Sequence, residues 1–216
     1  VVTLNYRLGL LGFLPIKDDE YDFMRILGLL DQQQALRWIQ SEIENFGGNP
    51  NNITIFGESA GGFSICHLLG MPSSDGLFHR AIIQSGGGCA PTTSAENARV
   101  GLVTALETAG CDVSSGESML SCMRTMPVDA ITDLLDDLPQ NGIGLTDVGP
   151  HRTNSIEQLG GYPRLRNTDQ INIPIMTGSN AEEMKLFSQL GYFQVDDQIQ
   201  FDAMLERITI DLELAP

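Results

Sequence analysis

The chain is short of basic residues and has no long apolar run. Only 12 of its 216 residues are lysine or arginine, against 28 that are aspartate or glutamate. The formal net charge of −16 argues against a nucleic-acid partner, because phosphates require a surface rich in lysine and arginine. The longest apolar candidate, Leu8 to Pro15, is far shorter than the ~20 residues of a membrane-spanning helix. We therefore expect neither a nucleic-acid partner nor a membrane span.

Metal-binding motifs are also missing. The four cysteines, Cys66, Cys89, Cys111 and Cys122, form no Cys-x-x-Cys pair and have no histidine at zinc-ligand spacing. We expect no metal and no other cofactor. Cys66 lies in an apolar helical run, which predicts a small buried side chain. Cys111 and Cys122 bracket a loop that a disulfide could close, but two reduced thiols in a cytoplasmic protein remain the alternative.

What is present is a pattern of short apolar strands alternating with amphipathic helices, with 42% hydrophobic residues overall. This alternation predicts an α/β protein with a mainly parallel sheet, whose strands 53–56 and 173–177 should be buried on both faces. Strands are expected at 1–5, 53–56, 80–84 and 173–177. Helices are expected at 30–46, 60–69, 97–109, 119–125, 128–138, 182–190 and 197–212. In the first helix, Asp31 and Gln34 have the spacing of a capping box.

One tight turn suggests the chemistry. The stretch NNITIFGESAGG runs from a short strand through Gly57, Glu58, Ser59, Ala60 and Gly61 into a helix. A strand, Gly-x-Ser-x-Gly and a helix form the nucleophile elbow of α/β-hydrolases. Side chains at both glycines are expected to strike a neighbouring strand or helix. The N–H of Ala60, at the positive end of the helix dipole, is the expected oxyanion donor.

The sequence around this turn resembles the type B carboxylesterase family, which includes the cholinesterases and related lipases. The similar segments are NYRLGLLGFL, GLLDQQQALRWIQSEIENFGGNPNNITIFGESAGG and FHRAIIQSGG. The resemblance implies an α/β-hydrolase fold, a central mostly parallel sheet flanked by helices and incomplete at both ends. Residues 1–216 would be the central part of a single catalytic domain. It also implies an ion pair between Arg7 and Asp31 in apolar surroundings.

The resemblance also implies roles for several side chains. The segment IPIMTGSNAEEMKLF is similar to the one that carries the triad acid, which makes Glu183 the acid, although Glu182 and Met184 depart from the family pattern. A solvated acid in the first turn of a helix is the alternative for Glu183. Glu58 would be a carboxylate on the pocket floor or a buried structural acid. The segment GCDVSSGESMLSCMRTMP resembles the family's looped cysteine pair, which favours a secreted or extracytoplasmic protein.

The base of a triad is expected outside the sequence. In this fold the order is Ser, Glu, His, so the histidine should follow Glu183. His67, His79 and His151 all precede it, and none is expected to serve. The family's glycine-rich oxyanion loop is expected before Val1. We therefore expect the chain to be an interior piece of a longer protein.

Two functions from different classes fit these residues. The first is a serine carboxylic ester hydrolase that acts on a small-molecule ester through an acyl-enzyme at Ser59. The alternative is a non-catalytic, cholinesterase-like adhesion or binding domain. Such domains typically lose the serine, so Ser59 together with Glu183 favours the enzyme. No motif indicates the natural ester or the oligomeric state.

A first prediction concerns residues 1–216 alone. Because the hydroxyl of Ser59 would lack its activating histidine, the isolated chain should neither hydrolyse a simple aryl ester nor react quickly with a fluorophosphonate. Each missing oxyanion donor would cost ~3 kcal/mol of transition-state stabilisation. The full-length protein should do both. Rapid stoichiometric labelling of the isolated chain, followed by mass spectrometry, would show that a base is present after all.

Overall fold

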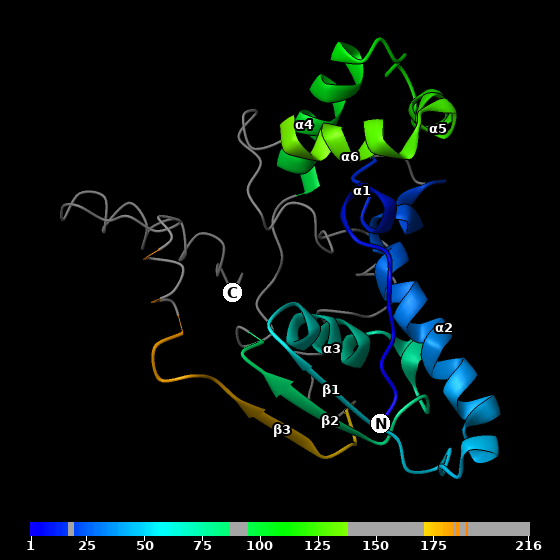
Figure 1. Cartoon of the computed structure of the whole chain (residues 1–216), viewed down its shortest axis with the longest axis vertical. Helices are drawn as coiled ribbons and strands as arrows, with labels where there is room; N and C mark the ends of the chain where they lie inside the picture. The colour runs from blue at the N-terminus through cyan, green and yellow to red at the C-terminus, as the bar shows by residue number, and fades with distance from the viewer. Residues whose placement is uncertain (17–19, 87–94, 138–170, 184, 186–188, 190–216) are drawn as a thin grey trace.

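A three-stranded parallel sheet forms the centre of the computed structural model (Figure 1). The structure describes residues 1–16, 20–86, 95–137, 171–183, 185 and 189. The strands lie in the order β1-β2-β3, and Glu58, Gln84 and Gly178 are in register at their last positions. Their bounds are Thr54–Glu58 for β1, Arg80–Gln84 for β2 and Ile175–Gly178 for β3. Chain segments that leave the three strands therefore start from one edge of the sheet.

Six α-helices and three 3-10 helices accompany the sheet in the described residues. The α-helices are α1 (Gly9–Gly12), α2 (Leu27–Glu42), α3 (Ala60–Gly70), α4 (Ala95–Thr108), α5 (Gly116–Thr125) and α6 (Val128–Asp137). The 3-10 helices are η1 (Asp22–Ile26), η2 (Ile43–Phe46) and η3 (Pro72–Ser74). In Figure 1, α3 lies along the sheet, and α4, α5 and α6 lie together near the N-terminal end of the long α2, away from the sheet.

The buried apolar residues form two main clusters. The sheet cluster joins α2, α3 and β2 and consists of Leu36, Ile39, Ile53, Ile65, Cys66, Leu68, Leu69, Leu77, Phe78, Ala81 and Ile83. The helical cluster joins α4, α5 and α6 to the segment around α1 and consists of Leu10, Leu14, Ile16, Leu102, Ala105, Leu106, Met119, Leu120, Met123, Ile131 and Leu134. Only the sheet cluster lies beside the edge at which the candidate site forms.

Most predicted elements are confirmed, and several have shifted ends. Strand 80–84 has the predicted bounds, and the helix predicted at 60–69 is α3. Strand 53–56 lies at 54–58 and strand 173–177 at 175–178. The helices predicted at 97–109, 119–125 and 128–138 are α4, α5 and α6. The one predicted at 197–212 and most of the one at 182–190 lie outside the described residues.

The predicted strand at 1–5 is wrong. The segment has no strand conformation and its residues are exposed, with Val1 fully exposed. A strand needs a neighbour for its N–H and C=O groups, and 1–5 pairs with none of the three described strands. High β-propensity alone does not supply that partner.

Arg7 and Asp31 form the ion pair that the resemblance implied. The guanidinium is bidentate, with Nε 2.7 Å from Oδ2 and Nη2 2.6 Å from Oδ1, and the backbone N–H of Arg7 also donates to Oδ2. Hydrogen bonds from Arg7 lower the pKa of Asp31, although partial burial opposes them. The prediction of apolar surroundings is wrong, because the side chain of Arg7 is 49% exposed and that of Asp31 is 25% exposed.

This pair also explains why the predicted capping box is wrong. The helix begins at Leu27 rather than near Asp31, and its N-cap residue, Ile26, makes no side-chain cap bond. Asp31 lies inside the helix, where its carboxylate binds Arg7, 24 residues earlier in the chain. A tertiary partner therefore replaces the local capping interaction.

The outer strands are more exposed than their apolar sequences predicted. Phe56 on β1 is 59% exposed, and Ile175 and Met176 on β3 are 44% and 66% exposed. Only the middle strand has buried residues, Ala81 and Ile83. Burial on both faces is therefore wrong for strands 53–56 and 173–177 as the structure describes them.

Cysteine pairing follows the resemblance at Cys111 and Cys122 and differs from the prediction at Cys66. Cys111 and Cys122 form a disulfide with a Cα–Cα distance of 5.7 Å, which joins the end of α4 to α5. Cys66 is buried as predicted, yet it is disulfide-bonded and not a free thiol. Cys89 lies outside the described residues.

A second prediction follows from this pairing. The full-length protein, denatured without reductant, should show no reactive thiol at Cys66, Cys111 or Cys122. Peptide mapping after alkylation would check it, and labelling of Cys111 or Cys122 without reductant would contradict it. Replacing Cys111 and Cys122 together by serine should lower the free energy of unfolding by about 3 kcal/mol, because a short loop is no longer closed in the unfolded chain.

Candidate active site

Ser59 connects β1 directly to α3 in a strained backbone conformation. Its φ is 52° and its ψ is −115°, a left-handed region that non-glycine residues rarely occupy and that costs roughly 1–3 kcal/mol. Its N–H donates to the Gln84 carbonyl at the end of β2, 2.9 Å away. Its carbonyl accepts the first helical bond, from Phe63, also at 2.9 Å. The predicted strand-turn-helix geometry is therefore present.

The turn is tight because two glycines lack a side chain. A Cβ on Gly57 would lie 2.6 Å from the backbone of Gly61, and one on Gly62 would lie 2.9 Å from the Gln84 carbonyl oxygen. A Cβ on Gly61 would meet no described atom within 4 Å. The steric need predicted at Gly57 is thus confirmed, whereas the one predicted at Gly61 belongs to Gly62.

The first backbone N–H groups of α3 come directly after Ser59 in the chain. Ala60 is the first residue of the helix, and the first N–H groups of an α-helix have no intrahelical acceptor. Ala60 is exposed and Ser59 is partly exposed, so both can be approached from outside. Glu58 is exposed as well, which contradicts the reading of it as a buried structural acid.

Glu183 follows β3 and is held by a residue three positions earlier. Its Oε1 accepts the backbone N–H of Asn180 at 3.0 Å, and its Oε2 accepts Asn180 Nδ2 at 3.1 Å. The pKa of Glu183 is lowered, first by hydrogen bonding to the Ser85 side chain and then by the Asn180 backbone N–H. Partial desolvation opposes this and the Asn180 amide adds to it. The carboxylate is therefore ionised at neutral pH.

Ser85 lies between the two predicted catalytic side chains. It follows β2, the middle strand, and it has a positive φ of 54° like Ser59. Its N–H donates to the carbonyl of Gly178 at the end of β3, 2.8 Å away. Ser59, Ser85 and Glu183 thus come from the same ends of three neighbouring strands. Neighbouring strands lie about 4.8 Å apart, so two strands with a third between them, like β1 and β3, lie about 10 Å apart. Ser59 and Glu183 therefore do not need to touch.

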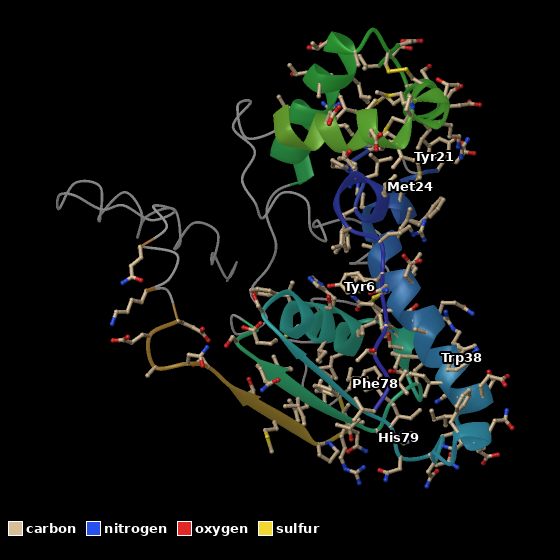
Figure 2. The ribbon with its side chains drawn as sticks, viewed as in Figure 1. Tyr6, Tyr21, Met24, Trp38, Phe78 and His79 are labelled. Atoms are coloured by element: carbon tan, nitrogen blue, oxygen red, sulfur yellow. A yellow bond between two sulfur atoms is a disulfide. The ribbon has the colours of Figure 1, made fainter. Side chains whose placement is uncertain are left out.

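The described histidines lie in other places. His67 is 4% exposed on the inner face of α3, and burial lowers its pKa to about 4. His79 precedes β2, where its Nδ1 accepts the backbone N–H of Ile53 at 3.1 Å (Figure 2). That is the opposite end of the sheet from Ser59. His151 lies outside the described residues, so no described histidine approaches Ser59.

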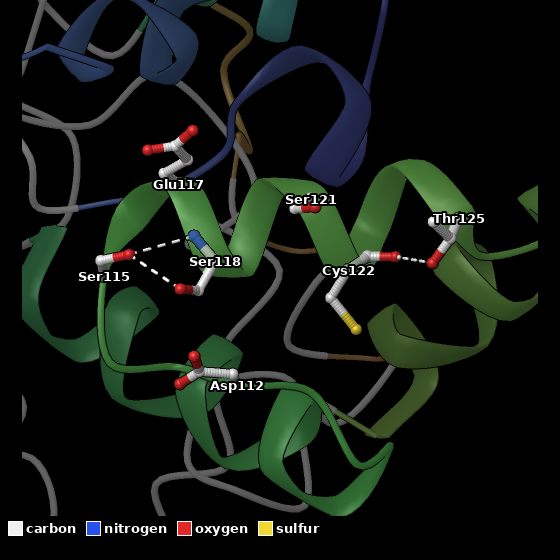
Figure 3. Close-up of a pocket in the computed structure, with 7 residues that line it drawn as sticks. All are labelled: Asp112, Ser115, Glu117, Ser118, Ser121, Cys122 and Thr125. Atoms are coloured by element: carbon white, nitrogen blue, oxygen red, sulfur yellow. Dashed lines mark hydrogen bonds between the residues drawn. The ribbon is translucent and has the colours of Figure 1, made fainter.

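A surface pocket lies on α5, around the disulfide loop (Figure 3). It is lined by Asp112, Ser115, Glu117, Ser118, Ser121, Cys122 and Thr125. Two of its serines bind each other at the start of the helix, because Ser115 caps α5 by accepting the N–H of Ser118 at 3.1 Å. Neither Ser59 nor Glu183 lines it. We therefore place the candidate site at the sheet edge and not in this pocket.

Across the described ranges, no three histidine, cysteine, aspartate or glutamate side chains come together in a way that could hold a metal ion. No helix among the same residues is long and apolar enough to cross a membrane.

Three contributors to this site were missed by sequence reasoning. Asn180 could have been found, since Asn-x-x-Glu has the spacing of a capping box. Gly62 could have been found as the second glycine after Ala60. Ser85 had no local signal, because its role depends on β3, which follows about 90 residues later in the chain.

A parallel sheet with a serine at a strained strand-to-helix turn defines the α/β-hydrolase class. Sequence comparison places the chain more closely, since the model of the "Carboxylesterase family" matches residues 1–214. The chain belongs to the carboxylesterase family.

Individual relatives agree with this assignment. The chain is 44% identical to the pyrethroid hydrolase Ces2e of Rattus norvegicus over 124 residues, which are 57% of this chain and 22% of that protein. It is 41% identical to the cholinesterase of Mus musculus over 206 residues, 88% of this chain and 32% of that protein. The crystal structure of the carboxylesterase EST55 from Geobacillus stearothermophilus matches with a TM-score of 0.78 and 34% identity, over 94% of this chain and 43% of that one. The chain thus spans about a third or less of the length of these two relatives.

A third prediction concerns His67, which is buried in its neutral form. The pKa of His67 is about 4 in the folded protein, whereas the ordinary value of 6.5 applies to the unfolded chain. Between these pH values the imidazole is therefore protonated in the unfolded chain and neutral in the folded protein. This contribution to stability is complete above the ordinary pKa and is lost as the pH falls towards 4. Lowering the pH from about 7 to about 5 should cost about 2 kcal/mol through this group.

Urea unfolding of the full-length protein at the two pH values would measure this cost. His67→Gln should lower the free energy of unfolding at neutral pH. Its further fall between about pH 7 and about pH 5 should be smaller than in the wild type by most of the contribution of His67. His79→Gln is the matched control, because His79 lies nearer the surface and is bound through Nδ1. An unchanged pH dependence in His67→Gln would contradict the prediction.

Proposed function

We propose that the full-length protein hydrolyses carboxylic esters through an acyl-enzyme on Ser59. The observation that carries the proposal is the elbow, in which a partly exposed Ser59 with a positive φ joins the end of β1 directly to the first residue of α3. Membership of the carboxylesterase family supports it. The names of the relatives, a pyrethroid hydrolase and a cholinesterase among them, support an ester as the substrate class.

In the proposed reaction, Ser59 Oγ attacks the ester carbonyl and its proton passes to a histidine that we expect beyond residue 216. The Ala60 N–H donates to the oxyanion that forms, and the alcohol leaves with the proton from the histidine. Water then attacks the acyl-enzyme by the same route and releases the acid. Glu183, ionised and hydrogen-bonded, orients the histidine and stabilises the imidazolium. Glu58 would carry negative charge beside the serine and favour a positive group there.

The disulfides support a secreted or otherwise extracytoplasmic location for this enzyme. Cys111 and Cys122 are bonded and so is Cys66, and such bonds persist in oxidising compartments. We propose no metal and no organic cofactor for the reaction, since a serine, a histidine and a carboxylate complete the proton transfers.

A fourth prediction tests the nucleophile in the full-length protein. Ser59→Ala should lower kcat for an aryl ester by about 1,000-fold or more without unfolding the protein, because only a hydroxyl is lost. Glu183→Gln should lower kcat by a similar order, since it leaves the imidazolium without a charge partner. Stopped-flow or plate assays would measure kcat of both variants, and thermal unfolding would show whether they remain folded.

Ser41→Ala is the matched control, because Ser41 is an exposed serine on α2 that binds only its own helix at the Trp38 carbonyl. It should keep wild-type kcat. Most of the activity remaining in Ser59→Ala would exclude Ser59 as the nucleophile. No esterase activity in the wild-type protein would instead favour the adhesion or binding domain.

A further inference from the structure

We propose that Asn180 is a positioning residue for the triad acid, which fixes the Glu183 carboxylate in one orientation without touching substrate. The inference rests on the proposed function, because it assigns Asn180 a part in the same reaction. Its basis is that one residue supplies two donors to the two oxygens of one carboxylate. The backbone N–H lies 3.0 Å from Oε1 and the side-chain Nδ2 lies 3.1 Å from Oε2.

Two bonds to different oxygens restrict the carboxylate more than two bonds to one oxygen would. The last torsion of a glutamate is broad and has no strong preference of its own, so a free carboxylate rotates. Donors on both oxygens stop this rotation. Ser85, at the end of β2, acts on the same carboxylate and lowers the pKa of Glu183. A carboxylate has about four lone-pair positions, so the two bonds from Asn180 leave room for the N–H of an imidazole.

The alternative role for Asn180 is to close a turn. Asn-x-x-Glu has the spacing of a capping box, in which the glutamate binds the backbone N–H of the first residue. That role uses the backbone N–H of Asn180 as a donor and its side-chain oxygen as an acceptor, but it does not use Nδ2. The side-chain bond from Nδ2 to Glu183 is additional, and its effect can be separated because asparagine and aspartate are about equally good in such turns.

Two substitutions separate these roles in the full-length protein. Asn180→Asp keeps the turn residue but replaces the amide donor by a second carboxylate facing Glu183. Asn180→Ala removes the side-chain donor and leaves the backbone N–H. If Asn180 only closes the turn, folded Asn180→Ala should keep the wild-type kcat, because the backbone N–H that binds Oε1 remains. Asn180→Asp additionally places a like charge beside Glu183. If Asn180 positions the acid, both variants should lower kcat about 10-fold or more, with little change in KM.

The pH profile provides a readout that a structural role would not move. A carboxylate with fewer donors, or with a second negative charge beside it, favours the charged imidazolium. The acid limb of kcat/KM, which reports the base, should therefore move to higher pH in both variants, and further in Asn180→Asp.

The chain offers a closely matched control in Asn45. Its Nδ2 donates to Oε2 of Glu42 at 3.2 Å, again across three residues, but on η2, which precedes the start of β1, whereas Ser59 follows its end. Asn45→Asp therefore makes the same chemical change to the same kind of pair. It should keep the wild-type kcat and the wild-type acid limb.

The outcomes are distinct. The role of Asn180 would be overturned if the folded Asn180→Ala or Asn180→Asp protein kept the wild-type kcat and an unmoved acid limb. The proposed function would still hold in that case, provided that Ser59→Ala is inactive. An active Ser59→Ala would overturn the proposed function itself. Near-UV circular dichroism and thermal unfolding identify the folded variants, and Asn180→Ala decides the question if Asn180→Asp does not fold.

Discussion

The left-handed backbone of Ser59 is the constraint on which the rest of the site depends. A strand that passes into a helix within one residue must reverse its direction without a loop, and only an uncommon φ allows it. The strain persists because the surroundings hold it. Gly57 and Gly62 let the start of α3 approach β1 and the end of β2, and the bond from Ser59 N–H to the Gln84 carbonyl fixes the turn. The sheet cluster then holds α3 in place from behind.

Features with a local signal could be predicted from the sequence, and features that depend on distant partners could not. The elbow, strand 80–84 and α3 are each encoded in a few adjacent residues. Segment 1–5 has the composition of a strand, but its state depends on a neighbour. Asp31 has the spacing of a cap, yet Arg7, far away in sequence, binds its carboxylate. In both cases a tertiary interaction, or its lack, overrides local propensity.

The same distinction applies within the candidate site. Ser59 was predicted from a motif and Glu183 from the family resemblance, and the structure puts them after the same ends of β1 and β3, the two outer strands. The need for a glycine was predicted at Gly61, but the close contact lies at Gly62. The cause is geometric, since consecutive helical residues point about 100° apart and only one of the two can face β2. Ser85 needed the order of the strands, because it acts on Glu183 only when β2 lies beside β3.

The two proposed catalytic groups are held by different forces, and this has consequences for how each tolerates change. Ser59 is fixed by steric contact, with a Cβ on Gly57 meeting backbone at 2.6 Å, so a larger residue there must displace the turn. Glu183 is fixed by hydrogen bonds to a partly exposed carboxylate, and such bonds are lost one at a time. Contacts between packed backbones are nearly all-or-none, whereas hydrogen-bond donors contribute in increments of about 1 kcal/mol. The nucleophile is therefore the rigid reference point of the site, and the acid is the part whose position and pKa can be adjusted by its neighbours.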